Sequence, residues 1–406
     1  MKKLFSTILI IFVFSCVKES SSDTTVKLVD ATPTNTNNTS NTSDNSDTSD
    51  TSDTSDTSDA SDTTDSSETF DRSGMLVNWA DNIIIPSYNE FKSSLSKLNE
   101  AINTFNNKTD NDNLILVRDK WLIAYKSWQH IEMITIGKAE ETYYQSKMNV
   151  YPSDIDRIER NISSESYDLT NANENDAQGF PALDYMLFGV ADSDEQILGK
   201  FSESSKQYSN YLTALVNEMI SNTNTVVDDW NTFRDNFITS TENTATSSIN
   251  KVTNDFIYYY EKGFRATKFG IPAGVFSGSK LPDRVEAYYS KKFSRELALE
   301  ALLAIENFFT GKEFDGEKIG GSLSSYLVFL NTEKNGTSLS KSITDQFAVA
   351  REKIKSLDEN FVSQIQSDNN SMLLTYDEIQ KGVVMLKTDM LQSLGINVDY
   401  VDADGD

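Results

Sequence analysis

Acidic side chains in apolar surroundings offer the clearest chemistry in this sequence. Glu132 and Asp184 each lie among apolar neighbours, which predicts partial burial and makes both acids candidates for an all-carboxylate metal site in a helical bundle. Asp184 belongs to the stretch GFPALDYMLFG, in which Pro181 suits the first turn of a helix. Asp184 is predicted to lie in the same turn, where the helix dipole favours its charge. The structural alternative is a buried acid held by backbone N–H groups or by an arginine.

The segments FRATKFGIPAG and LPDRVEAYYS hold a second set of polar residues. Arg265 and Lys268 lie three residues apart at the end of a predicted helix, before a glycine-bearing loop. Glu286 and Ser290 lie four residues apart, on what we predict to be the next helix. Two cations, a glycine-bearing loop and an acid could line a polar ligand pocket. An ion pair between Arg265 and Glu286 is the structural alternative.

The residue types that are scarce exclude several kinds of chemistry. His130 is the only histidine and there is no HExxH motif, whereas catalytic zinc sites usually take two or three histidines, or histidine with glutamate. A Ser-His-Asp triad would have to use His130, which we expect to be a satisfied surface or boundary residue on a tryptophan-rich helix. Cys16 is the only cysteine, which excludes a disulfide within the chain. A metal ion (iron, zinc or calcium) is the one cofactor that stays open.

The N-terminal segment has the pattern of a bacterial lipoprotein. The sequence MKKLFSTILIIFVFSC joins two lysines, an apolar run shorter than the roughly 20 residues that span a bilayer, and Cys16 in a setting that resembles a lipobox. We predict a signal peptide over residues 1–16, lipidation of Cys16 and an anchor in the outer membrane, with the protein in the periplasm or on the cell surface. Residues 17–72 are rich in Ser, Thr and Asp and are predicted to form a disordered acidic tether.

Helical periodicity dominates the remaining sequence, whereas no sustained strand-type alternation occurs. Apolar residues recur at alternating steps of three and four, which is typical of helices packed in bundles, so the predicted fold class is all-α with long helices. We expect a domain boundary around Trp230–Asn243. The apolar seams run over Ile84–Phe105, Val117–Ile131, Ile249–Gly263, Ile343–Phe361 and Ile379–Met390.

Helix ends and connections are marked by polar residues, glycine and proline. Asp154 or Ser153 is a predicted helix N-cap, and Gly395 is a predicted C-cap after Leu394. The segment Phe269–Pro282 is predicted to be a long irregular connection, and connections of this length inside a compact domain are often functional.

Taken together, these motifs resemble those of the imelysin family of bacterial envelope proteins. GFPALDYMLFG looks like the helix that bears the GxHxxE motif of that family, and YYEKGFRATKFGIPAG and PDRVEAYYS look like motifs of its second half. The resemblance covers Met75–Asp406. It implies two helical bundles, which we place at residues 73–235 and 236–406, and a site at their interface. Members of the family have been described as metallopeptidases, and others are linked to iron uptake.

The resemblance also assigns roles by position. Gly179 matches the family glycine, Pro181 replaces the histidine and Asp184 replaces the glutamate. Because proline offers no metal ligand, we expect a non-catalytic protein that binds iron, haem, a peptide or an envelope molecule. An imelysin-type metallopeptidase with a modified site, and a structural or adhesion lipoprotein, are the alternatives. The predicted ligand-binding residues are Gly179, Pro181, Asp184, Glu132, Arg265, Lys268, Glu286 and Ser290.

Charge and composition narrow the partners. The net charge of −26 argues against nucleic acid, which leaves the outer membrane, through the lipid anchor, and a small ligand or peptide. We expect a monomer. Asp402, Asp404 and Asp406 alternate like the first ligands of an EF-hand loop, but the chain ends before the remaining ligands, so we expect weak calcium binding there or none.

Overall fold

A computed structural model describes residues 69–400, and these residues belong to one compact unit. The predicted signal peptide, Cys16, nearly all of the predicted tether and the aspartates at the C-terminus lie outside the described residues. Apart from one short hairpin, the regular structure in the described part of the chain is helical, which confirms the predicted all-α class. No helix in residues 69–400 is both long enough and apolar enough to cross a bilayer.

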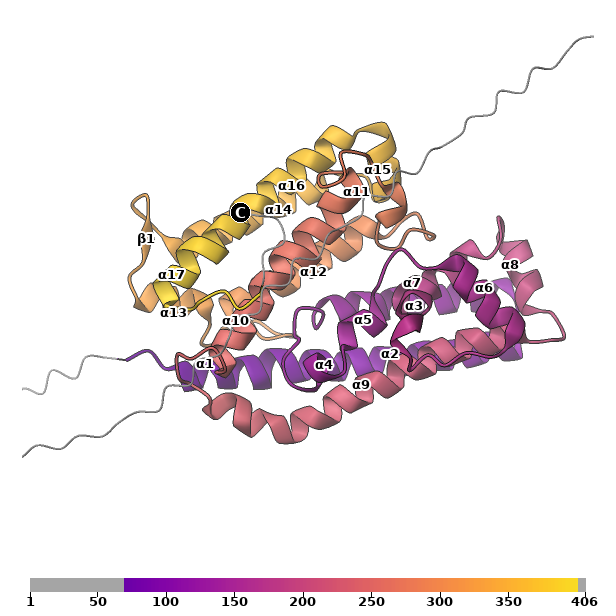
Figure 1. Ribbon diagram of the computed structural model, residues 1–406, viewed down its shortest axis with the longest axis horizontal. Coiled ribbons are helices and arrows are strands. Elements are labelled where there is room, and N and C mark those ends of the chain that lie inside the picture. Colours follow the sequence, from indigo (N-terminus) through magenta and orange to yellow (C-terminus); the bar gives the residue numbers. More distant parts are fainter. Residues whose placement is uncertain (1–68, 401–406) are drawn as a thin grey trace, which may run out of the picture. The chain divides into compact units, whose positions relative to one another are not determined.

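The first half of the fold packs around three long helices. Helix α2 packs against α3 and α9, and the shorter elements between α3 and α9 complete this bundle (Figure 1). Its elements are α1 (Arg72–Asn78), η1 (Trp79–Ile84), α2 (Ile85–Asn107), α3 (Asn111–Gln129), α4 (Lys138–Glu141), α5 (Tyr144–Met148), α6 (Ile155–Ser164), η2 (Ala172–Ala177), α7 (Gly179–Asp184), η3 (Tyr185–Gly189), α8 (Asp194–Phe201) and α9 (Gln207–Thr239).

The second half forms another bundle, drawn in orange and yellow in Figure 1, in which α14 packs against α12 and α16. Helix α12 also packs against α3 of the first bundle. The elements of the second bundle are α10 (Ser248–Tyr258), η4 (Tyr259–Gly270), α11 (Ile271–Ala273), η5 (Pro282–Arg284), α12 (Ser294–Thr310), α13 (Leu323–Phe329), β1 (Glu333–Lys334), β2 (Thr337–Ser338), α14 (Leu339–Lys355), α15 (Phe361–Ser367), α16 (Asn369–Val384), η6 (Met385–Met390) and α17 (Leu391–Leu394).

Most of the predicted helices are present, and one seam is interrupted. The seam predicted over Ile343–Phe361 is divided, because α14 ends at Lys355 and α15 begins at Phe361. The side chain of Asn360 accepts a hydrogen bond from the N–H of Val362 and so starts a new helix at that point. The predicted caps at Asp154 and Gly395 are confirmed. The boundary predicted between residues 235 and 236 falls within α9 and stays a prediction.

Of two predictions on the segment around residue 280, one is partly right and one is wrong. The connection predicted over Phe269–Pro282 is irregular from Gly274 to Leu281, but it is helical up to Ala273, and Gly274 ends the helix with a left-handed φ of 84°. The predicted helix over Leu281–Ser290 consists of a single 3₁₀ turn, Pro282–Arg284, followed by turns. Ala287 has a φ of 57°, which a right-handed helix does not allow.

The start of the fold packs against its second half. Asn78 Nδ2 donates hydrogen bonds to the backbone oxygens of Gly311, at 3.0 Å, and Gly321, at 3.1 Å. The ring of Trp79 stacks on Phe308 with centroids 4.6 Å apart, and its Nε1 donates to the Phe308 oxygen. The described residues therefore join the two bundles through α1 and η1 as well as through α3 and α12.

Candidate functional site

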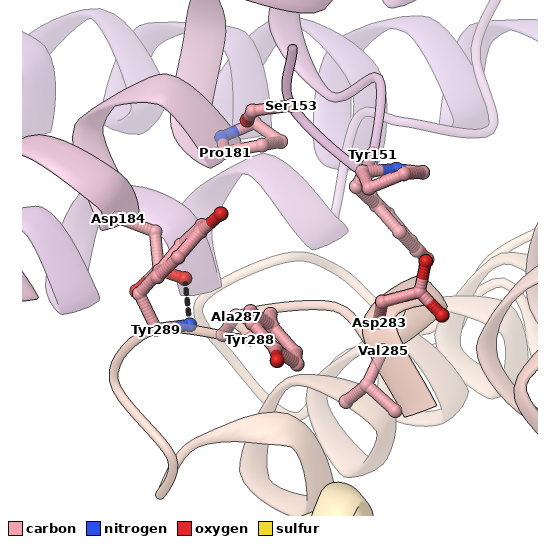
Figure 2. A pocket seen from close by; sticks show the side chains of 10 residues that line it. Tyr151, Ser153, Pro181, Asp184, Asp283, Val285, Ala287, Tyr288 and Tyr289 are labelled. Atoms are coloured by element: carbon pink, nitrogen blue, oxygen red, sulfur yellow. Dashed lines mark hydrogen bonds between the residues drawn. The ribbon is translucent and has the colours of Figure 1, made fainter. Parts of the chain in front are cut away.

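A pocket of about 290 Å³ opens where the first bundle meets the segment that follows η5. Its walls come from the loop before α6, from α7 and η5, and from the turns after η5, as Figure 2 shows. It contains two of the residues that the resemblance singled out, Pro181 and Asp184. The lining residues are Tyr151, Pro152, Ser153, Pro181, Asp184, Asp283, Val285, Ala287, Tyr288 and Tyr289.

Gly179 sets the position at which α7 begins. Its φ is 73°, in the left-handed region that favours glycine. A Cβ atom there would lie 2.2 Å from the backbone oxygen of Met148, at the end of α5. Gly179 therefore allows α7 to pass directly beside α5, which brings Pro181 and Asp184 to the pocket wall.

Phe180 fixes the rotation of α7 against the first bundle. Its ring stacks on Tyr125 with centroids 4.2 Å apart and planes 3° apart. Trp121 Nε1 donates to the backbone oxygen of Phe180 at 3.4 Å. All three aromatic residues are fully buried, so Phe180 anchors α7 in the core and fixes the positions of the neighbouring pocket residues Pro181 and Asp184.

Asp184 ties α7 to the turns that follow η5. Its Oδ2 accepts the N–H of Tyr289 at 2.7 Å and its Oδ1 accepts the N–H of Ser290 at 3.0 Å. The side chain is buried, which raises the pKa of Asp184 to about 7, while the two backbone hydrogen bonds act in the opposite direction. This arrangement matches the structural alternative of an acid held by backbone N–H groups. Because α7 begins at Gly179, Asp184 is its last residue and not part of its first turn.

Three charged residues form a buried group behind the pocket, which we call the carboxylate–lysine cluster: Glu132, Lys268 and Glu286. Lys268 Nζ lies 2.7 Å from Glu286 Oε2 and 3.6 Å from Glu132 Oε2. Glu286 stands between Val285 and Ala287, which both line the pocket, but its own side chain is directed at Lys268. The structure thus brings together three of the predicted site residues.

Neutral side chains complete the hydrogen bonding of the carboxylate–lysine cluster. Asn149 Nδ2 donates to Glu132 Oε1 at 2.6 Å and to Glu286 Oε1 at 3.0 Å, so it bridges the two acids. Tyr259 donates from its hydroxyl to Glu132 Oε2 at 2.8 Å. Gln129 Nε2 donates to Glu286 Oε1 at 3.2 Å. Charges buried in this way are tolerated because they are paired and hydrogen-bonded.

Arg265 and Ser290 differ from their predicted roles. Arg265 donates a hydrogen bond to the hydroxyl of Tyr376 at 2.5 Å and lies on the side of η4 that packs against α16, away from the pocket lining. The ion pair that the structure shows for Glu286 is with Lys268, so the predicted Arg265–Glu286 pair is wrong. The two cations lie three residues apart on η4, on different sides of the helix, and they face different partners. Ser290 contributes its backbone N–H, to Asp184.

The residues predicted to bind a metal do not fit that role. Both oxygens of Asp184 accept backbone hydrogen bonds, and both oxygens of Glu132 accept hydrogen bonds from side chains. Within residues 69–400, no group of three or more His, Cys, Asp or Glu side chains is placed to hold a metal ion. His130 lies elsewhere and pairs with Glu300 at 2.8 Å.

The sequence as a whole can now be compared with known proteins. A family model described as imelysin matches residues 84–384, which include most of both bundles and all the residues of the pocket. The chain belongs to the imelysin family. This assignment confirms the resemblance drawn from the motifs around Asp184 and Lys268.

Individual relatives of this imelysin-family chain are distant in sequence. Iron-regulated protein A from Synechococcus elongatus is 25% identical over 123 residues, an alignment that spans 30% of this chain and 33% of that relative. Two crystal structures share the fold. The imelysin-like protein from Psychrobacter arcticum has a TM-score of 0.64 at 18% identity and covers 81% of this chain and 97% of its own. A protein from Parabacteroides distasonis, described as an iron-regulated protein A precursor, has a TM-score of 0.65 at 16% identity, with 80% and 97% covered.

Several residues of the pocket and of the carboxylate–lysine cluster were not found from the sequence. Asn149, which contacts the cluster, and Tyr151 and Ser153, which line the pocket, lie in the loop that we considered only for a helix N-cap. Tyr288 and Tyr289 lie in a motif that we recognised, but the predicted helix hid their place on the pocket wall. Two features of the sequence could have pointed to these residues. They are the loop that contains Pro152 and, in the second half, the tyrosine pair Tyr288 and Tyr289.

Proposed function

We propose that this imelysin-family protein is a non-catalytic ligand-binding protein of the cell envelope, and that its ligand occupies the pocket beside Pro181. The observation that carries this proposal is the state of Asp184, whose two oxygens are used to hold the backbone of Tyr289 and Ser290. Asp184 therefore has a structural role, because it holds the pocket wall in place. Pro181 beside it has no proton to donate and no lone pair for a metal.

Envelope location and ligand are part of the same proposal. The N-terminal sequence supports a lipid anchor at Cys16 in the outer membrane, with the protein in the periplasm or on the cell surface. The names of two relatives refer to regulation by iron, which keeps iron and haem among the ligands to be tested. A peptide and an envelope molecule complete the set.

Thermal unfolding of the purified protein tests the proposal. Iron, haem and peptide pools are added in turn, and a ligand at 100 times its dissociation constant should stabilise the protein by about 2.7 kcal/mol. The shift should be lost in Tyr288→Ala and kept in Tyr143→Ala, because Tyr288 lines the pocket whereas Tyr143 is 76% exposed outside it. If every shift survives in Tyr288→Ala, the ligand binds elsewhere and the proposal is wrong.

An imelysin-type peptidase with a rebuilt site is the second candidate, and the carboxylate–lysine cluster favours it. Lys268 and Glu286 are buried charged groups directly behind the pocket, as general bases in active sites often are. Incubation with an unfolded protein substrate, with and without chelator, decides between the two. Cleavage that disappears in both Asp184→Ala and Glu286→Gln, but not in Tyr143→Ala, would replace the binding proposal with an enzyme. A structural or adhesion role predicts neither cleavage nor binding.

A further inference from the structure

Aromatic rings form the walls of the pocket. Tyr288 and Tyr289 stand at 88° to each other with centroids 5.0 Å apart, so they make a corner. Tyr289 is held in place by an edge contact with Tyr185, with centroids 5.1 Å apart. Tyr151 lies on another wall of the same space, as Figure 2 shows. Three tyrosine rings around one small space resemble the aromatic cages that hold ammonium groups.

The charges around the pocket are mainly negative. Asp184 and Asp283 both line it, whereas the described lining residues include no lysine and no arginine. Arg284, next to the lining, is exposed and lies 3.7 Å from Asp283. Behind the wall, Lys268 is matched by two glutamates. A carboxylate or phosphate ligand would therefore find no cation on the wall, whereas a cationic ligand would find the carboxylate of Asp283 and ring faces.

Ser153 also lines the pocket, but its Oγ is shielded from the pocket space, so the hydroxyl is not a contact atom for a ligand. The contacts that the pocket offers are therefore the tyrosine rings and the carboxylate of Asp283.

We infer that the pocket binds an organic ammonium group, held in the corner of Tyr288 and Tyr289 with Asp283 at its edge. This inference rests on the proposed function, because it names the ligand class of the same pocket. The volume of about 290 Å³ lies near the lower limit for ligand pockets, so it admits one ammonium head with its nearest carbons and not a large cofactor. Primary and quaternary ammonium groups would both rely on the ring faces and on the carboxylate of Asp283.

Choline and its uncharged isostere, 3,3-dimethylbutan-1-ol, separate charge from shape. The two molecules differ in the replacement of a nitrogen by a carbon, so a shape-selective apolar pocket binds them alike. We expect calorimetry to show that choline binds about fivefold to thirtyfold more tightly than the isostere, the range that corresponds to cation–π attraction. Ethanolamine, titrated in the same way, tests a primary ammonium.

Variants of one tyrosine place the effect in the pocket. Tyr288→Leu should abolish the preference for choline over the isostere, whereas Tyr288→Phe should keep it, because the ring face remains. Tyr143→Leu is the matched control on an exposed tyrosine outside the pocket. Circular dichroism checks that each variant is folded.

The outcomes are distinguishable from those of the wider proposal. Equal binding of choline and isostere, lost in Tyr288→Leu, would overturn the ammonium inference and leave ligand binding at this pocket intact. If neither choline nor ethanolamine binds, the ammonium inference is also overturned. Thermal unfolding with iron, haem and peptide pools then tests whether the pocket binds another ligand. A preference for choline that persists in Tyr288→Leu would show that the cation binds at another site, which contradicts the inference.

Discussion

Lys268 Nζ lies 2.7 Å from Glu286 Oε2, and the two side chains are only 2% and 3% exposed. The pair joins η4 to the turns that carry Tyr288 and Tyr289, so its integrity determines how the pocket wall is placed. Removal of one member of such a pair leaves a buried charge without its counterion, which is far more destabilising than the loss of a surface pair.

We therefore predict that Lys268→Met lowers the free energy of unfolding by about 3–5 kcal/mol in urea titrations. The double variant Lys268→Met/Glu286→Gln should lose less than the sum of the two single variants, because it removes both charges of the pair. Lys341→Met is the control, since Lys341 and Asp345 form an exposed pair whose removal should change stability by less than about 0.5 kcal/mol. A loss in Lys268→Met as small as in the control would contradict the prediction.

A second prediction concerns pH. The pKa of Asp184 is raised from its usual 3.8 to about 7, mainly by burial, so the folded state binds this proton more tightly than the unfolded state. The contribution of Asp184 to the free energy of unfolding is therefore largest below about pH 4 and falls as the pH rises to about 7, by at most about 1.4 kcal/mol per pH unit.

Asp184→Asn removes this titration, so the difference in stability between the wild type and Asp184→Asn should shrink from pH 4 to pH 7 and stay constant above it. Urea titrations at intervals of one pH unit measure that difference. Asp255, which is buried and also has a pKa raised to about 7, is present in both proteins and cancels. A difference that is constant or that grows over this range would show that Asp184 does not titrate as described.

A third prediction compares two glycines. Gly179→Ala should destabilise the protein by more than about 1 kcal/mol, because Gly179 has a φ of 73° and a Cβ there would meet the Met148 oxygen at 2.2 Å. Gly199→Ala should instead stabilise it by about 0.5–1 kcal/mol, since Gly199 lies within α8 and a Cβ there meets nothing within 4 Å. Thermal unfolding of both variants tests this. Shifts of the same sign would contradict the account of α7.

The fourth prediction restores the histidine of the family motif. Pro181→His, alone or with Asp184→Glu, should not create a zinc site detectable by calorimetry. One histidine and one carboxylate fall short of the three protein ligands of catalytic zinc sites, and the described residues offer no further group placed to complete the set. A micromolar zinc site in Pro181→His that is absent from the wild type would show that the pocket retains a latent metal geometry.

Much of the fold could be predicted from the sequence, because apolar spacing records which face of each helix is buried. The seams through α2, α3, α10 and α16 follow directly from steps of three and four. The division between α14 and α15 could not be foreseen, because the apolar spacing continues across it while Asn360 starts a new helix.

The site was only half predictable, and the reason lies in particular residues. Asp184 and Glu132 could be singled out as acids among apolar neighbours, and Lys268 and Glu286 as charges on either side of a glycine-bearing loop. The partner of each charge, however, depends on which elements meet. Ala287 is the clearest failure. Alanine gives no sequence signal for a φ of 57°, yet that conformation directs Glu286 inward and leaves Tyr288 and Tyr289 on the pocket wall.

The packing of α1 and η1 on the second bundle has a consequence for the order in which the chain folds. Phe308, the residue on which Trp79 stacks, comes 229 residues after it in the sequence, and Gly321 comes 243 residues after Asn78. At about 5–20 residues per second, synthesis takes roughly 11 to 49 seconds to supply those partners. During this time the face that α1 and η1 turn to the second bundle has no native partner there. Among the described residues, the first helix is thus one of the last to complete its native contacts.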